Sequence, residues 1–143
     1  MSVVMQKLLE ISRKGVVSEN DLDYFEEHIE NFPDKWGKLY LWSIQSKNYQ
    51  LSDYLLESGL DLNTCEDVRR DVMKSYSLYG LYSEKIIQDG FEITKDIYHL
   101  IINIYSKDQY FERDRIEKDF NYCTFRDRER KILKIKVRIS RKI

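Results

Sequence analysis

The sequence predicts an all-α fold of stacked antiparallel helix pairs, followed by a basic C-terminal tail or strand. Three observations lead to this class: turn residues are scarce, apolar residues recur at helical spacing, and one nine-residue pattern occurs twice. The 143 residues include five Gly and one Pro. All-β folds need many turn residues, so this scarcity favours helices with short connections. Helical spacing of i, i+3, i+4, i+7 and i+8 is followed by Ile97, Leu100, Ile101, Ile104 and Tyr105.

Eight helices are expected, arranged as four pairs. A second apolar stripe at helical spacing comprises Val68, Val72, Tyr76 and Tyr79. Turns are expected at Gly15 and Gly80, and the pairs form a repeat domain over residues 1–125, with a tail over 126–143. About four units suffice for a stable stack, because each buries its apolar face against its neighbours. The predicted pairs are 3–14 with 20–31, 36–47 with 51–58, 65–78 with 83–89, and 95–105 with 109–118.

The repeated pattern gives the strongest prediction. Residues 55–63 (LLESGLDLN) and 86–94 (IIQDGFEIT) match in character at every position, 31 residues apart. Each segment is expected to end a helix with a glycine at positive φ, Gly59 or Gly90. Fainter copies lie at 116–123, with Asp119 in place of the glycine, and at 25–32, with Asn31 there.

Polar residues mark where the helices should begin. Ser18 with Asp21, and Thr64 with Asp67, have the spacing of capping boxes with Asp in place of Glu. Thr94 is expected to cap the helix that follows the second glycine turn.

These residues resemble the ankyrin-repeat family, in which units of about 33 residues contain two antiparallel helices and a turn. The segment 55–63 is similar to the end of the family's second helix, and Gly37 with the following Leu39, Tyr40 and Leu41 lies where its first helix begins. The chain departs from the family at Leu39-Tyr40-Leu41-Trp42, where the family has Thr-Pro-Leu-His, and at Ile44-Gln45, where it has alanines. The resemblance implies a module that binds proteins without catalysis.

Charge divides the chain unevenly. Residues 1–125 carry 15 Lys and Arg against 23 Asp and Glu, whereas residues 126–143 carry nine against two. Apolar Leu133, Ile135, Val137 and Ile139 alternate with mostly basic residues, which is typical of a strand or an extended segment. Three interpretations are open: the tail folds back to cap the acidic repeats, contacts an acidic partner protein, or binds nucleic acid.

Two groups of residues are candidates for partner contacts. Tyr and Trp dominate interface hot spots, and Trp36 is the preferred aromatic anchor because it lies in a turn. The aromatic candidates are Trp36, Tyr40, Tyr79 and Tyr82, and the basic ones are Lys134, Lys136, Arg138 and Arg141.

The sequence contains few residues arranged as catalytic or cofactor-binding motifs, so no enzyme activity, cofactor or metal is predicted. The sequence lacks G-x-G-x-x-G, the P-loop and G-x-S-x-G. His28 and His99 fall in different predicted units and have no partner at zinc-ligand spacing. Asp119 with Glu129 and Lys131 resembles the carboxylate and lysine arrangement of Mg²⁺-dependent nucleases, a remote alternative.

The composition indicates a cytoplasmic binding protein. No run of 18 apolar residues is present, the N-terminal residues do not resemble a signal peptide, and Cys65 and Cys123 are too few for a disulfide framework. We expect a protein–protein interaction module, an inhibitor or adaptor that occupies a partner's surface, with no membrane or small-molecule substrate. Degenerate repeats rich in Ile, Lys, Asn, Asp and Tyr resemble viral and phage proteins that act on host factors. Nucleic-acid binding through 126–143 is the alternative.

Overall fold

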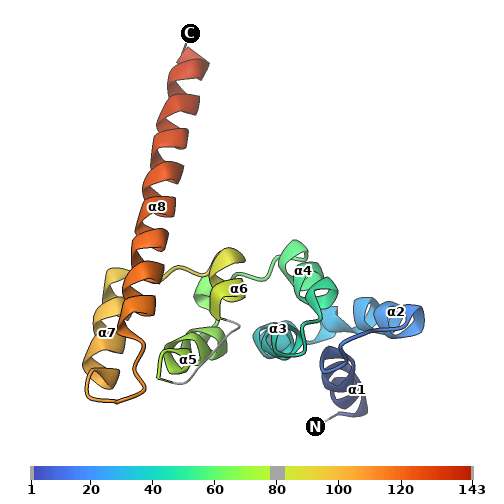
Figure 1. Cartoon of the computed structure of the whole chain (residues 1–143). Helices are drawn as coiled ribbons and strands as arrows, with labels where there is room; N and C mark the ends of the chain where they lie inside the picture. Colours follow the sequence, from blue (N-terminus) through green and yellow to red (C-terminus); the bar gives the residue numbers. More distant parts are fainter. Residues whose placement is uncertain (1, 78–82, 143) are drawn as a thin grey trace.

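The computed structural model describes residues 2–77 and 83–142, with side chains described as far as residue 140. These residues form eight α-helices and three short 3₁₀ turns, and no strand occurs among them (Figure 1). The prediction of an all-α fold is therefore confirmed. The helices are α1 (Val3–Ser12), α2 (Glu19–His28), α3 (Trp36–Gln45), α4 (Tyr49–Glu57), α5 (Glu66–Ser75), α6 (Ser83–Gln88), α7 (Lys95–Tyr105) and α8 (Arg113–Lys142), and the turns are η1 (Ile29–Asn31), η2 (Pro33–Lys35) and η3 (Leu62–Thr64).

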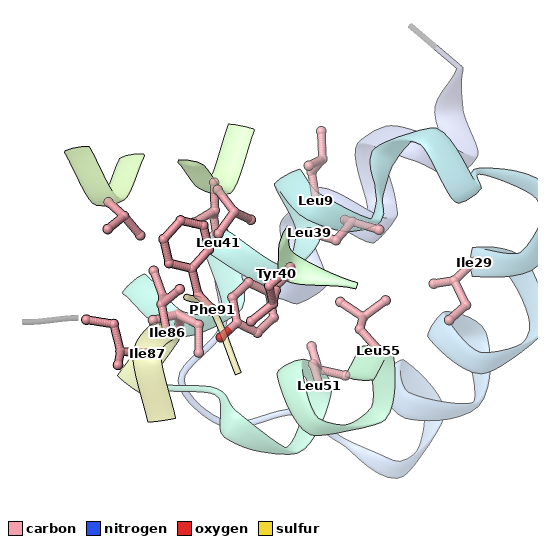
Figure 2. Packing of buried hydrophobic residues seen from close by; sticks show 14 of the residues in the cluster. Leu9, Ile29, Leu39, Tyr40, Leu41, Leu51, Leu55, Ile86, Ile87 and Phe91 are labelled. Carbon is pink, nitrogen blue, oxygen red and sulfur yellow. The ribbon is translucent and has the colours of Figure 1, made fainter. Parts of the chain in front are cut away.

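Helices that follow each other in the chain pack together. Contacts join α1 to α2, α3 to α4, α5 to α6 and α7 to α8, and further contacts join α1 to α3 and α3 to α5. One buried cluster extends from Met5 on α1 to Cys123 on α8, and Figure 2 shows members of it from α1, α3, α4 and α6. The buried cluster thus extends across all four pairs of helices.

The two predicted glycine corners are present and alike. Gly59 and Gly90 have φ of 111° and 116°. In each, the glycine N–H donates to the carbonyl three residues back, and the next N–H donates to the carbonyl five residues back. This paired arrangement is a Schellman motif, which requires a left-handed residue that glycine adopts without a Cβ clash.

A third corner of the same kind was not predicted, because no glycine marks it. Lys47 has φ of 58° at the end of α3, and the N–H of Asn48 donates to the carbonyl of Ser43 at 2.8 Å. The buried Asn48 side chain then accepts from the N–H of Leu51 to cap α4 and donates to the carbonyl of Lys14. Asn48 therefore supplies the local hydrogen bonds that hold this turn together.

The fainter copies of the repeat do not form corners. Asn31 ends η1, but it does not adopt the left-handed conformation, since Lys47 is the one described residue other than glycine with positive φ. Asp119 lies inside α8, where the helix continues because no glycine stops it.

The predicted helix starts are confirmed at two positions out of three. Ser18 and Asp21 form a capping box, and Thr94 caps α7 by accepting from the N–H of Ile97. The box at Thr64 is wrong, because its hydroxyl donates to the carbonyl of Asp61 instead, and Cys65 is the residue that precedes α5.

The predicted apolar stripes are confirmed in α5 and only partly in α7. Val68, Val72 and Tyr76 are fully buried, whereas Tyr79 and the turn at Gly80 lie outside the described residues. On α7, Ile101 is fully buried but Leu100 and Ile104 are exposed, because no further helix pair covers that side. Part of the α7 face is thus left open at this end of the row of helices.

The tail is helical, so the prediction of a strand or extended segment is wrong. Residues 113–142 form a single helix, within which the predicted boundary between 125 and 126 falls. Figure 1 shows α8 projecting beyond the other helices, so the tail does not fold back to cap the repeats. Alternation over seven residues misled the prediction, since the same apolar residues also distribute around a helix and the described residues include no strand to pair with.

Candidate protein interface on α8

The first half of α8 is anchored in the core. Ile116 is fully buried and Cys123 is buried, and the ring of Phe120 stacks on that of Tyr98 with centroids 4.5 Å apart. The Cys123 Sγ accepts a hydrogen bond from the N–H of Ile93 at 3.4 Å. Burial raises the pKa of the Cys123 thiol, which favours its neutral form as a packed side chain. These contacts fix the direction of the helix.

Arg126 joins α8 to the end of α6. Its guanidinium donates to the carbonyl of Ile87 at 2.6 Å and to the carbonyl of Phe91 at 2.7 Å. One of these carbonyls lies in the last turn of α6, where helix carbonyls lack intrahelical donors. One turn further along, Arg130 pairs with Glu92. The basic residues at the middle of α8 thus bind the Gly90 corner.

Two buried tyrosines connect successive helix pairs in the same way. The Tyr40 hydroxyl on α3 donates to Asp89 after α6, and the Tyr76 hydroxyl after α5 donates to Asp119 on α8, both at 2.6 Å. Burial raises the pKa of both tyrosines well above its ordinary value. Burial also raises the pKa of Asp119, although the Tyr76 hydrogen bond opposes the shift. The same tyrosine–aspartate hydrogen bond thus occurs twice along the row of helices, and the second one holds the anchored half of α8.

The second half of α8 has no cover from the rest of the chain. Every residue from 128 to 140 is exposed, including Ile135 at 56%. Ile132, Ile135 and Ile139 are spaced i, i+3 and i+7, so they lie on one side of the helix, and the exposed Phe125 precedes them by seven residues. We call residues 128–142 the free end of α8, and Ile132, Ile135 and Ile139 its apolar stripe.

Basic side chains flank the apolar stripe. At 100° per residue, Lys131 and Arg138 lie along one edge of it and Lys136 along the other. Lys134 and Arg138, four residues apart, place like charges next to each other, which destabilises an isolated helix. The β-branched residues of the stripe also have weak helix propensity. The free end would therefore gain helical stability from a surface that is both apolar and acidic.

The predicted contact residues fall into different environments. Lys134, Lys136 and Arg138 are exposed on the free end, and Arg141 lies in its last turn with its side chain outside the described residues. Tyr79 and Tyr82 also lie outside the described residues. Tyr40 is fully buried, so its prediction as a surface anchor is wrong: it packs in the core with its hydroxyl held by Asp89. Figure 2 labels it among the core residues.

Trp36 lies away from α8. It is half-buried, and its indole N–H donates to the carbonyl of Ile29 at 2.8 Å, which fixes the ring. It lines a groove of 510 Å³ between the η2 turn and the start of α5. Four exposed carboxylates surround this groove, from Asp34, Asp61, Glu66 and Asp67. The surface around this groove is thus acidic, and Trp36 presents only part of its ring there.

The residues considered for catalysis are not brought together. Asp119 and Glu129 lie ten residues apart on one helix, which separates them by about 15 Å along its axis, too far to share one Mg²⁺. His28 packs against Tyr24, and His99 against Tyr98. Among the residues that the structure describes, no three His, Cys, Asp or Glu side chains are grouped to hold a metal ion. Asp119 and Glu129 therefore do not form the shared Mg²⁺ site that the nuclease interpretation needs.

No helix in the described part of the chain combines the length and the apolar character that crossing a membrane requires. No family model matches the sequence, and no curated protein and no solved structure matches it either. The resemblance to ankyrin repeats therefore remains a prediction from the residues quoted for it.

Sequence reasoning identified the basic residues of the free end but missed its apolar stripe. Phe125, Ile132 and Ile139 recur every seven residues, with Ile135 between the last two. That spacing is a helical signal. Over residues 133–139 the sequence also fits the alternation of a strand. The helical spacing can be told from that alternation only when the pattern is followed back to Phe125.

Proposed function

We propose that this chain is a protein–protein interaction module, an inhibitor or adaptor that acts by occupying a partner's surface, with the free end of α8 as its contact element. The observation that supports this most directly is the exposure of the whole apolar stripe. Exposed apolar side chains that share one side of a helix are a common feature of docking elements, in which the apolar side enters a groove of the partner. The Lys and Arg residues beside the stripe favour an acidic partner.

In this proposal the other helices form an ankyrin-like stack that holds α8. Support comes from the contacts of α3 with both α1 and α5, and from the equal corners at Gly59 and Gly90. A stack of this kind is rigid, because each unit is fixed by its neighbours. The free end is therefore presented in a defined direction. Cys65 and Cys123 are free thiols, which suits work in the reducing cytoplasm.

The test is binding to a purified partner, first captured from a lysate and then titrated by calorimetry. Ile135→Asp places a charge in the apolar stripe without touching the core, and we expect it to weaken binding at least about tenfold. Val16→Asp is the matched control, because Val16 is 88% exposed and lies in the turn after α1. Equal affinities of the two variants would rule out the free end as the contact element.

Nucleic acid is the alternative ligand, favoured by the alignment of Lys131, Lys134 and Arg138 at i, i+3 and i+7. Binding of a duplex by the whole protein, with affinity that falls steeply with salt and is lost in Lys134→Glu/Arg138→Glu but retained in Ile135→Asp, would support it. For a protein partner, Ile135→Asp should weaken binding more than Lys134→Glu/Arg138→Glu does, because the isoleucine side chain supplies the buried apolar contact.

A further inference from the structure

A groove at the other end of the molecule combines apolar side chains with carboxylates, whereas the free end of α8 combines apolar side chains with basic ones. It lies between α2 and α4, has a volume of 260 Å³, and is lined by Leu22 and Tyr54 together with polar residues. Both of these apolar side chains are half-buried against the core, so one face of each remains accessible. The polar lining consists of Glu26, Gln50, Asp53 and Glu57.

The surroundings of this groove are strongly acidic. Residues 15–34, which include all of α2, carry seven Asp and Glu and no Lys or Arg. Glu26 and Glu57 are exposed and form no ion pair with a described residue, whereas Asp53 lies 3.8 Å from Lys85. The groove therefore offers an apolar floor with free carboxylates on both sides.

The two surfaces are complementary in chemistry and cannot meet within one chain. The apolar stripe of α8 is flanked by Lys131, Lys136 and Arg138, which suits a groove with carboxylates on each side. The anchored half of α8 is fixed by Ile116 and by the Arg126 hydrogen bonds. Figure 1 shows α2 and α8 at opposite ends of the row of helices, with the free end directed away.

We propose that the free end of α8 in one copy of this chain lies in the groove between α2 and α4 of a second copy. This rests on the proposed function, since it uses the same contact element, and it names a second copy as the partner. Ile132, Ile135 and Ile139 face Leu22 and Tyr54, while the flanking cations lie near Glu26 and Glu57. Different surfaces of the two copies meet, so the contact is head-to-tail and builds either an open row or a closed ring.

Sedimentation velocity on the full chain tests this assembly over a range of concentrations at low and high salt. The wild type is expected to form species larger than the monomer at low salt and to dissociate at high salt, because exposed charges are screened. Ile135→Asp and the pair Glu26→Lys/Glu57→Lys should each weaken association about tenfold or more. Val3→Asp and Glu10→Lys, which change exposed residues of α1 outside both surfaces, should associate like the wild type.

A charge exchange separates this contact from others. Lys131→Glu/Lys136→Glu/Arg138→Glu reverses the charges on both edges of the apolar stripe, which the acidic groove then repels, and Glu26→Lys/Glu57→Lys gives a basic groove that repels the basic edges of the wild-type stripe. Each variant alone should associate at least about tenfold more weakly than the wild type, and their mixture should assemble, because each then finds the opposite charge in the other. Circular dichroism confirms that both variants are folded.

Three results would overturn the proposal. The first is a wild type that stays monomeric at low salt at every concentration. The second is assembly that survives the reversal of Glu26 and Glu57, which would show α8 pairing with itself. The third is a mixture that fails to assemble. If the chain is monomeric while Ile135→Asp still abolishes binding to a different purified protein, the second copy is refuted and the proposed function stands.

Discussion

The two halves of α8 belong to one helix but have opposite surroundings. Residues 113–127 bury Ile116 and Cys123 and bind the Gly90 corner through Arg126. Residues 128–140 are exposed throughout, although they include five large apolar side chains. The first half is held by buried tertiary contacts, whereas the second half is held by its own backbone hydrogen bonds and by two exposed ion pairs, Arg130 with Glu92 and Lys131 with Asp127.

The difference shows where the stability of this chain arises. Isolated helices of this length are marginal in water, because nucleation is costly and each added residue gains little. The free end also combines β-branched residues with like charges four residues apart. Contact with a partner surface would add the helical stability that the sequence of the free end does not provide. This is the physical basis for expecting the free end to dock.

Amide hydrogen exchange should show the largest contrast between the two halves. In the monomer, we expect amides around 116–126 to exchange only through global unfolding, which for a domain of this size costs about 5–15 kcal/mol. Amides around 130–139 should open at a cost of about 1 kcal/mol or less. The measurement is mass-spectrometric exchange at high salt, where self-association is suppressed. Equal protection of both halves would contradict the contrast.

Two identical substitutions within α8 test the same contrast by equilibrium unfolding. Ile116→Ala removes a fully buried side chain and should lower the free energy of unfolding by about 2–5 kcal/mol. Ile135→Ala, at an exposed position of the same helix, should change it by less than about 0.5 kcal/mol. Urea titration followed by circular dichroism gives both values. A large effect of Ile135→Ala would mean that the free end packs on this chain.

Much of the fold could be predicted because local signals and tertiary packing agree over most of the chain. The glycines at 59 and 90 fix helix ends through backbone sterics, and Ser18 and Thr94 fix helix starts through side-chain acceptors. These are short-range effects that one sequence carries in full. The corner at Lys47 was missed because Asn48 and the packing of α3 stabilise a conformation that lysine does not prefer.

The candidate contact surfaces were harder to predict, because exposure is a property of the whole fold. Tyr40 and Trp36 are both aromatic residues near the start of α3, yet one is fully buried and the other half-exposed. Only the positions of the neighbouring helices decide this. The groove between α2 and α4 likewise joins residues about 30 positions apart, which no local pattern relates.

The Gly90 corner supports the anchored half of α8, so straining it should destabilise the fold moderately. Gly90→Ala puts a Cβ on a residue with φ of 116°, although no neighbouring atom is close, and should cost about 1–2 kcal/mol. Gly15→Ala is the control, because Gly15 lies in a turn without positive φ and its added Cβ would make only ordinary contact, 3.7 Å from the Ser46 carbonyl oxygen. Thermal unfolding of both variants measures the difference. A neutral Gly90→Ala would show that the corner relaxes.

The smallest expected effect is a titration in the anchored half. Burial raises the pKa of Asp119, so the native state keeps this proton at a pH where the unfolded chain has lost it. The unfavourable contribution of the buried carboxylate is fully present above the raised pKa and disappears as pH falls through it. Asp21 behaves in the opposite way, because the hydrogen bond from Lys14 lowers its pKa below the ordinary 3.8. Carbon NMR of the carboxyl groups should therefore give midpoints on opposite sides of that value.

Tyr76→Phe sharpens this titration, because it removes the hydroxyl that donates to Asp119. Losing a donor to the carboxylate should raise the Asp119 midpoint further and leave the Asp21 midpoint in place. Tyr110→Phe, at an exposed position, is the control and should move neither midpoint. An Asp119 midpoint unchanged by Tyr76→Phe would mean that the hydroxyl does not donate to it in solution. The link between α5 and the anchored half would then consist of apolar packing and the Arg115 contacts around the Tyr76 ring.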